Sequence, residues 1–463
     1  MSAFQWRDHR PSILVASLGS AFGVALLDLT GALATLLSSN RDIGSSAALG
    51  VFLSVLALVF IAIATYVSAV VTANTFATII AGRTRTIALM RLIGATARSQ
   101  RAAVANEGLI VGVIGSLLGA LVGTAVVFIA ISIAELTGFI PTLAYGYAAP
   151  VIAIPIVAVV LTTWLASWVG SRRVLVVTPM QATGAALDLS IADVSGKRGR
   201  RATAIVLFSV GTALLLLGML VGLATPAATL IGVLGGMLSF SGLVLGAQVI
   251  MPPALRLVGR MLGSSPASRL AAENAVRYPE RSARTTIGLV IGITLVTMFA
   301  VAATSYQQAI ASLPLGAEGN AAADQLVLVT VVIFSVLIGF SALIAAVGMV
   351  NNLSLSVLQR TRELGLLRAI GFTAGQLRGM IRAESAQLSI ASLLVGLVLG
   401  VGYGWAGAQS LLGSLVHGLV VPVVPVWLLV AVVVIAAVLT AAASAVPARR
   451  ATAVSPVAAL AVE

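Results

Sequence analysis

Long apolar runs separated by short polar and basic stretches form the dominant pattern of this chain. A helix that crosses the roughly 30 Å hydrocarbon core of a bilayer needs about 20 consecutive apolar residues. Because a spanning helix satisfies its backbone hydrogen bonds within the segment, such runs predict an all-α polytopic membrane protein. We predict about ten transmembrane helices, at residues 12–36, 50–78, 104–133, 149–170, 202–223, 227–251, 285–310, 325–350, 384–406 and 424–446.

Basic residues mark one side of the predicted bundle. Of the 27 Lys and Arg residues, all except Arg41 precede the first span, follow the last span or lie in loops on that same side. Lys and Arg accumulate in cytoplasmic loops, so this distribution predicts a multi-pass protein of the cell membrane with both termini in the cytoplasm. The net charge of +13 follows from this topology. Its dispersal among loops argues against nucleic acid as a partner.

Composition excludes most enzymatic chemistry. Hydrophobic residues make up 59% of the 463 positions, charged residues 9%, and cysteine is absent. The single lysine, Lys197, lies in no GxxxxGK[ST] phosphate-binding pattern. His9 and His417 fall on opposite sides of the predicted membrane, which excludes a histidine-based zinc site or catalytic triad. We therefore predict no catalytic residue, metal or cofactor in this chain.

An internal repeat divides the chain. The segment RTRTIALMRLIGATARSQR from Arg83 aligns without gaps with RTRELGLLRAIGFTAGQLR from Arg360, and ten of nineteen positions are identical. The same alignment, at an offset of 277 residues, pairs the second to fourth spans with the eighth to tenth. Corresponding spans are six apart, an even number, so the two copies have the same orientation in the membrane. The commonest secondary-transporter plan uses inverted repeats instead. We predict a first unit at 1–190, a connecting helix pair at 191–262 and a second unit at 263–463.

The repeated segments, about 83–101 and 360–378, interleave basic and apolar residues on the cytoplasmic side, and a glycine is expected to end a short helix in each. One interpretation is an amphipathic helix that lies on anionic lipid. The other is a docking element for a cytoplasmic partner, which the duplication favours because a two-lobed partner needs two docking helices. The predicted docking residues are Arg83, Arg85, Leu89, Met90, Arg91, Gly94, Arg360, Arg362, Glu363, Leu366, Leu367, Arg368 and Gly371.

Small residues recur four apart in the span that follows each docking segment. Residues at that spacing share a helix face, and small side chains let two helix backbones approach closely in lipid. We predict helix packing at Gly115, Gly119, Gly123, Ser392, Gly396 and Gly400.

Ionisable residues within spans are candidates for function. Asp28 is the clearest, with a substrate or proton role as one interpretation and a solvated position near the outer end of its span as the other. Glu107 and Glu384 begin their predicted spans, where a carboxylate complements a helix N-terminus. Because no acid falls near a predicted midplane, a proton-driven carrier lacks its usual signature.

These motifs resemble a known family. The two repeated segments are similar to the coupling-helix region of the FtsX-like (MacB-type) permeases of ABC transporters, as are the glycine-patterned spans and the closing ARR...SPVAAL at 448–460. The stretch AENAVRYPERSARTTIGLVIGITL, at 272–295, resembles the entry into a permease unit. The resemblance implies that each coupling helix docks on one subunit of an ATP-binding dimer, which binds ATP and Mg and moves the spans as levers.

The resemblance extends to topology, with two departures. The order of one, three, two, one and three spans is similar to that of the bacitracin-resistance permeases, for which a sensor kinase is a further expected partner. Thr86 replaces the acidic residue found at Glu363, and the predicted outer loops, such as 311–323, are too short for a large extracytoplasmic domain.

The expected function is that of a permease subunit for export or extraction of a hydrophobic, lipid-like or antibiotic peptide substrate. Two alternatives stay open. One is a proton-coupled secondary transporter, and the other is a non-transporting membrane subunit that signals to an external partner.

Overall fold

A computed structural model describes ten continuous parts of the chain, residues 6–39, 93–138, 140–147, 150–171, 193–261, 279–312, 331–343, 370–416, 418–427 and 429–438. It also describes portions of 55–74 and the single positions 89, 90, 273, 327, 346, 347, 367 and 440. Within these ranges every regular element is helical. The elements are α1 (Trp6–Ser39), α5 (Ala97–Leu136), η1 (Pro150–Ile152), α6 (Ala153–Gly170), α8 (Asp193–Val221), η3 (Pro226–Ala228), α9 (Thr229–Leu245), α10 (Ala247–Met261), α12 (Pro279–Ala311) and α15 (Ala374–Val416).

Seven stretches in this described part are long and apolar enough to cross a membrane. They are Ser12–Leu36, Arg98–Leu136, Pro150–Val169, Arg198–Val221, Pro226–Leu245, Thr286–Ala311 and Ala374–Ser414. Each coincides with one predicted span. Shorter apolar helices at Ile61–Val71, Val331–Leu343 and Leu429–Val438 fall inside the other three predictions. The prediction of an all-α polytopic membrane protein is therefore confirmed.

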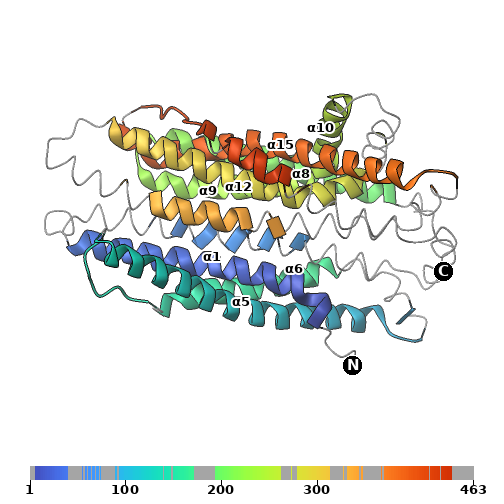
Figure 1. Ribbon diagram of the computed structural model, residues 1–463, viewed down its shortest axis with the longest axis horizontal. Helices are drawn as coiled ribbons and strands as arrows, with labels where there is room; N and C mark the ends of the chain where they lie inside the picture. The colour runs from blue at the N-terminus through green and yellow to red at the C-terminus, as the bar shows by residue number, and fades with distance from the viewer. Residues whose placement is uncertain are drawn as a thin grey trace.

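The long helices run side by side in two groups (Figure 1). Helices α1, α5 and α6 form one group, and α8, α9, α12 and α15 form the other, with the helix at 331–343 drawn between them. The aromatic ring of Phe22 in α1 joins the groups, with its centroid 6.3 Å from that of Phe299 in α12 and 5.9 Å from that of Phe340. Most residues of α1 and α12 are buried, so these two helices form the centre of the bundle.

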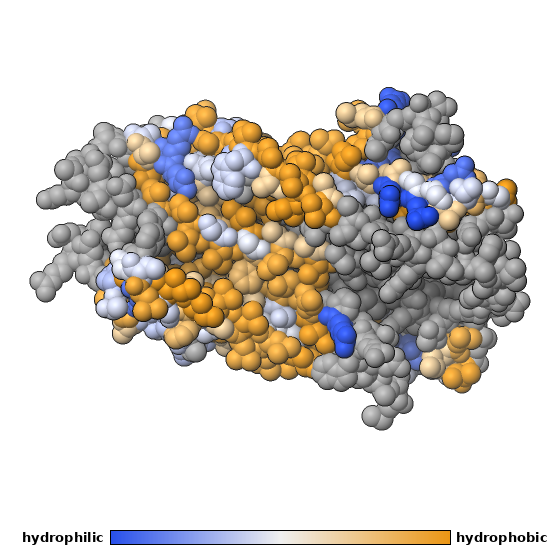
Figure 2. Space-filling model, viewed as in Figure 1, coloured by the Kyte–Doolittle hydropathy of each residue, from blue (hydrophilic) through white to orange (hydrophobic). Residues whose placement is uncertain are grey.

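Apolar residues cover the middle of the visible face, and strongly hydrophilic ones gather toward its ends (Figure 2). Two helices extend beyond such a band. Helix α5 has 40 residues and α15 has 43, which correspond to about 60 and 65 Å at 1.5 Å per residue. Each is about twice the thickness of a hydrocarbon core. The predicted spans 104–133 and 384–406 captured only the apolar part of these helices.

The predicted sixth span ends differently from the expectation of 227–251. Helix α9 ends at Leu245, and the N–H of Gly246 donates to the carbonyl of Gly242 at 2.8 Å. Helix α10 then leaves in a new direction (Figure 1) and packs against α12 and α15. It buries one apolar face and carries Arg256 and Arg260. The apolar run continues across this break, so hydropathy alone placed the boundary too late.

Candidate functional site

Both repeated segments contain the same turn, after which α5 or α15 begins. Gly94 has a φ of 100°, and the N–H of Ala95 donates to the carbonyl of Met90 at 3.0 Å. Gly371 has a φ of 107°, and the N–H of the next residue donates to the carbonyl of Leu367, also at 3.0 Å. A left-handed glycine with this long-range hydrogen bond is a Schellman helix end. In each repeat the helical turn before the glycine therefore stops at the glycine.

A threonine then starts the next helix in each repeat. The hydroxyl of Thr96 accepts from the N–H of Ser99 at 3.1 Å and caps α5. The hydroxyl of Thr373 accepts from the N–H of Gln376 at 3.2 Å, and the Gln376 side chain accepts from the N–H of Thr373 at 3.0 Å. The second arrangement is a capping box. The two caps set where the long helix after each turn begins.

Apolar side chains lie uncovered at these turns. Ile93 is 80% exposed and Ile370 is 70% exposed, and Leu89 and Met90 are also exposed, while Leu367 is half-buried. The other predicted docking residues, Arg83, Arg85, Arg91, Arg360, Arg362, Glu363, Leu366 and Arg368, lie outside the described residues. The described part of each docking segment thus presents an apolar surface that a partner or a lipid surface could cover.

The small residues of the first repeat lie against α1. A Cβ atom added at Gly115 would lie 2.6 Å from the Cβ of Ala16, and one at Gly123 would lie 2.6 Å from the carbonyl oxygen of Ala21. Gly119, between them, meets the α1 backbone still more closely. The contacts advance in the same direction along both helices, so α1 and α5 are parallel and in direct backbone contact.

The second repeat builds the same arrangement from α12 and α15. A Cβ atom at Gly396 would lie 2.7 Å from Ile293 Cγ2, and one at Gly400 would lie 2.8 Å from the carbonyl oxygen of Thr294. Ser392, at the place of the third glycine, is buried and its hydroxyl donates to a carbonyl of its own helix at 2.7 Å. Each unit therefore contains a tightly packed pair of parallel helices.

Asp28 does not have the solvated position that the sequence favoured. It is 5% exposed, it interacts with the Thr124 side chain of α5, and its Oδ2 atom has no hydrogen-bond partner among the described residues. It lies close to the loop at 140–147, where burial raises the pKa of the Tyr147 phenol and the nearby Glu135 and Asp28 carboxylates raise it further. Neighbouring helices and this loop, which a hydropathy pattern cannot place, produce the burial.

The capping interpretation of the two glutamates is wrong. Helices α5 and α15 begin at Ala97 and Ala374, ten residues before Glu107 and Glu384. The polar residues that precede each apolar run are already helical, so the helices start earlier than hydropathy indicates. Threonines supply the caps instead.

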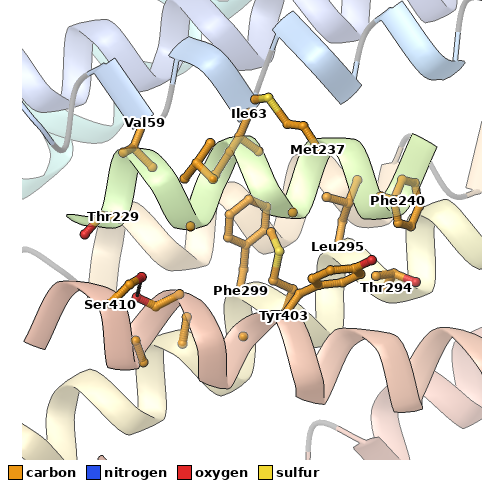
Figure 3. Close-up of a pocket in the computed structure, with 18 of the residues that line it drawn as sticks. Val59, Ile63, Thr229, Met237, Phe240, Thr294, Leu295, Phe299, Tyr403 and Ser410 are labelled. Atoms are coloured by element: carbon orange, nitrogen blue, oxygen red, sulfur yellow. Dashed lines mark hydrogen bonds between the residues drawn. The ribbon is translucent and has the colours of Figure 1, made fainter. Parts of the chain in front are cut away.

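One feature of the membrane interior escaped the sequence reasoning altogether. A cavity of about 160 Å³ lies between α9, α12, α15 and the helical segment Ile61–Val71 (Figure 3). Its lining includes Tyr66 and Tyr403, whose hydroxyls lie 2.9 Å from the hydroxyls of Ser241 and Ser239 on α9. The available signal was a tyrosine within each of two apolar spans, but no sequence spacing connects Tyr66 with Tyr403.

A family model described as FtsX-like permease C-terminal matches residues 58–179 and 325–456, more than half of the chain. The chain belongs to the FtsX-like permease family. Each matched segment contains one of the two Schellman turns and one of the two long helices, α5 or α15. This FtsX-like permease therefore carries the family's C-terminal unit twice, as the internal repeat predicted.

Two relatives from Bacillus subtilis (strain 168) match shorter stretches. The uncharacterized ABC transporter permease YknZ is 39% identical over 72 residues, which are 16% of this chain and 18% of that protein. The ABC transporter permease YtrF is 31% identical over 65 residues, which are 14% of this chain and 15% of that protein. The matches thus span less than a fifth of either relative, and both relatives are named as ABC transporter permeases.

Proposed function

We propose that this FtsX-like permease is the membrane-spanning subunit of an ABC transporter that docks a dimer of separate ATP-binding subunits through the segments before Gly94 and Gly371. One observation carries the proposal. A helix end with an exposed apolar surface occurs twice, at equivalent positions of the two family-matched segments. A partner with two equivalent lobes has two equivalent surfaces to offer, and ATP and Mg bind to that partner.

Energetics support docking through these surfaces. Burying one Leu, Ile or Met side chain contributes about 1.5–3 kcal/mol, and an isolated short helix is marginal in water. Ile93 and Ile370 together with their neighbours therefore provide several kcal/mol when they are covered. The fixed caps at Thr96 and Thr373 then transmit the partner's movement directly into α5 and α15, which we propose act as levers.

The proposed substrate is hydrophobic, either lipid-like or an antibiotic peptide, and it is exported or extracted from the membrane. Both termini and both docking segments face the cytoplasm, as the distribution of basic residues indicates. A central cavity with uncharged walls supports an apolar substrate over a charged one.

Introducing negative charges at the docking surface tests the proposal. The double variant Leu89→Glu and Leu367→Glu should lose both co-purification with the ATP-binding subunit and permease-dependent ATP turnover, because two apolar contacts are replaced by charges. The matched control is Leu136→Glu, at the exposed opposite end of α5, which should retain both. Unchanged association and turnover in the double variant would show that the segments lie on lipid instead.

A proton-coupled or cation-coupled carrier is the second candidate, because the carboxylate of Asp28 is buried with one oxygen unpartnered among the described residues. Substitution Asp28→Asn separates the two functions. In an ATP-driven transporter, ATP turnover in proteoliposomes should persist and should not depend on a proton gradient. Transport driven by a proton gradient and abolished in Asp28→Asn would favour the carrier.

A further inference from the structure

The central cavity lies where three parts of the chain meet. The segment Ile61–Val71 belongs to the first unit, α8 and α9 to the connecting pair, and α12 and α15 to the second unit, and all of them contribute lining side chains. Figure 3 shows Thr229 and Ser410 at one end of the cavity and Phe240 and Thr294 at the other. Any movement between the units therefore changes its shape.

The cavity is long and narrow. Its lining residues on α12 extend from Ile291 to Tyr306, a distance of about 22 Å along a helix axis. That distance is most of the roughly 30 Å hydrocarbon core. A volume of only about 160 Å³ spread over such a length leaves room for one slender ligand but not for a folded peptide or a macrocycle.

The walls select an apolar ligand. None of the lining residues carries a charge, and most are aliphatic or aromatic, such as Phe299, Phe334 and Met298. Apolar cavities of about 150 Å³ stay free of water and accept hydrocarbon ligands. Water is therefore a poor occupant along most of this cavity, and a phosphate or ammonium group would be buried there without a counter-charge.

Hydroxyl groups are also present at the end of the cavity near Phe240 and Thr294. Tyr66 and Tyr403 are held by α9 serines through the hydrogen bonds described above. Thr294 lines the same end, is 2% exposed, and its Oγ1 atom has no hydrogen-bond partner among the described residues. A buried hydroxyl without a partner is costly, so this end provides a hydrogen-bond site for one neutral polar atom of a ligand.

We propose that this cavity binds a single linear hydrocarbon chain, acyl or isoprenoid, of a membrane lipid or a lipid-anchored molecule. The apolar walls hold the chain, and the charged head group stays outside the cavity. Binding of a hydrocarbon chain does not depend on the ATP-binding subunit. The assignment of the cavity as a substrate site, however, rests on the proposed transport function. The two are therefore measured separately.

A pair of glycines on α15 provides the test. Gly407 lines the cavity and Gly402 does not, and a Cβ atom at either position has no neighbour within 4 Å. Substitution Gly407→Phe therefore fills the cavity without a backbone clash, and Gly402→Phe is the matched control. Gly236→Val fills the cavity from α9, where the nearest atom to a Cβ is 3.8 Å away, and replaces Gly407→Phe if that variant does not fold.

The assay is photocrosslinking of the permease in nanodiscs that contain phosphatidylglycerol with a diazirine at the end of one acyl chain. Peptides around Phe240 and Tyr403 should be labelled in the wild-type protein and in Gly402→Phe, and this labelling should be lost in Gly407→Phe or Gly236→Val. Loss on addition of unlabelled polyprenyl phosphate, but not of palmitate, assigns an isoprenoid chain, and the reverse assigns an acyl chain.

Equal labelling of the cavity-filled and control variants, or labelling confined to lipid-facing residues such as Leu217, would show annular lipid only and overturn the proposal. Permease-dependent ATP turnover is measured in parallel with the same variants. Absence of such turnover in the wild-type protein contradicts the ATP-driven function but leaves the crosslinking result, and hence the chain-binding site, standing.

Discussion

Replacing Gly371 with alanine tests whether the duplicated turn sets the geometry of docking. At a φ of 107° an L-residue is strained, and the left-handed conformation costs a non-glycine residue about 1–2 kcal/mol. No atom lies within 4 Å of the added Cβ, so the effect comes from the backbone alone. In the free permease the variant turn can open and relieve this strain. If docking requires the closed turn, binding must restore the strain, and the docking free energy becomes less favourable by up to that amount.

That strain corresponds to an affinity for the ATP-binding subunit that is lower by roughly 5–30-fold, as 1.4 kcal/mol is a factor of ten. Titration of the ATP-binding subunit against the permease in nanodiscs measures this change, with permease-stimulated ATP turnover as a second readout. Gly94→Ala should act in the same direction, since its φ of 100° imposes the same strain. Both changes together should weaken binding more than either alone.

The matched control is Gly375→Ala in the first turn of α15, where the nearest atom to the new Cβ is 3.9 Å away. Alanine is favoured over glycine inside a helix by about 0.5–1 kcal/mol, so this variant should bind and turn over ATP like the wild type. If Gly371→Ala lowers the thermal stability of the permease but leaves affinity and turnover unchanged, the turn is a structural element only and the docking argument fails.

Three further outcomes are expected. Gly119→Leu should lower the thermal unfolding midpoint in detergent, because overpacking costs about 1–3 kcal/mol and the glycine lies against the α1 backbone, whereas Gly402→Leu should not lower it; equal midpoints would contradict the packing. A cysteine introduced at the exposed Ser312 should react with an impermeant thiol reagent in intact cells, whereas a cysteine introduced at Ser99 should not. Labelling of the cysteine at position 99 would refute the topology. Arg101→Gln should lower the same midpoint modestly, since the guanidinium lies 4.2 Å from an indole centroid and such contacts contribute about 0.5–2 kcal/mol; an unchanged midpoint would show that this contact adds nothing.

The sequence predicted those features that depend only on residues close together along the chain. Apolar run length located the spans because the bilayer sets the length of a helix directly. The glycines of the repeated segments could be identified as helix ends because few other residues adopt a positive φ. The family resemblance was carried by these same local motifs, and the match to both repeats confirms it.

Features that depend on tertiary packing could not be predicted in the same way. The glycine spacing around Gly119 indicated a packed face, but nothing in it identified α1 as the neighbour. The burial of Asp28 depends on α5 and on the loop at 140–147, which hydropathy cannot place. The cavity combines Tyr66, Thr294 and Tyr403 from three distant segments, and neither hydropathy nor motif spacing carries a signal for such a combination.

The uninterrupted length of α15 determines how far a rotation at one end of the helix displaces residues farther along it. No proline occurs between Ala374 and Val416, so the helix has no built-in hinge of the kind that most often bends helices. Gly404 lies thirty residues from the capped end, or about 45 Å along the axis. A rotation of about 5° at Thr373 would carry Gly404 sideways by about 4 Å, a displacement comparable with the width of a cavity that holds one chain. Small angular changes near the docking turn are therefore large enough to open or collapse the membrane interior.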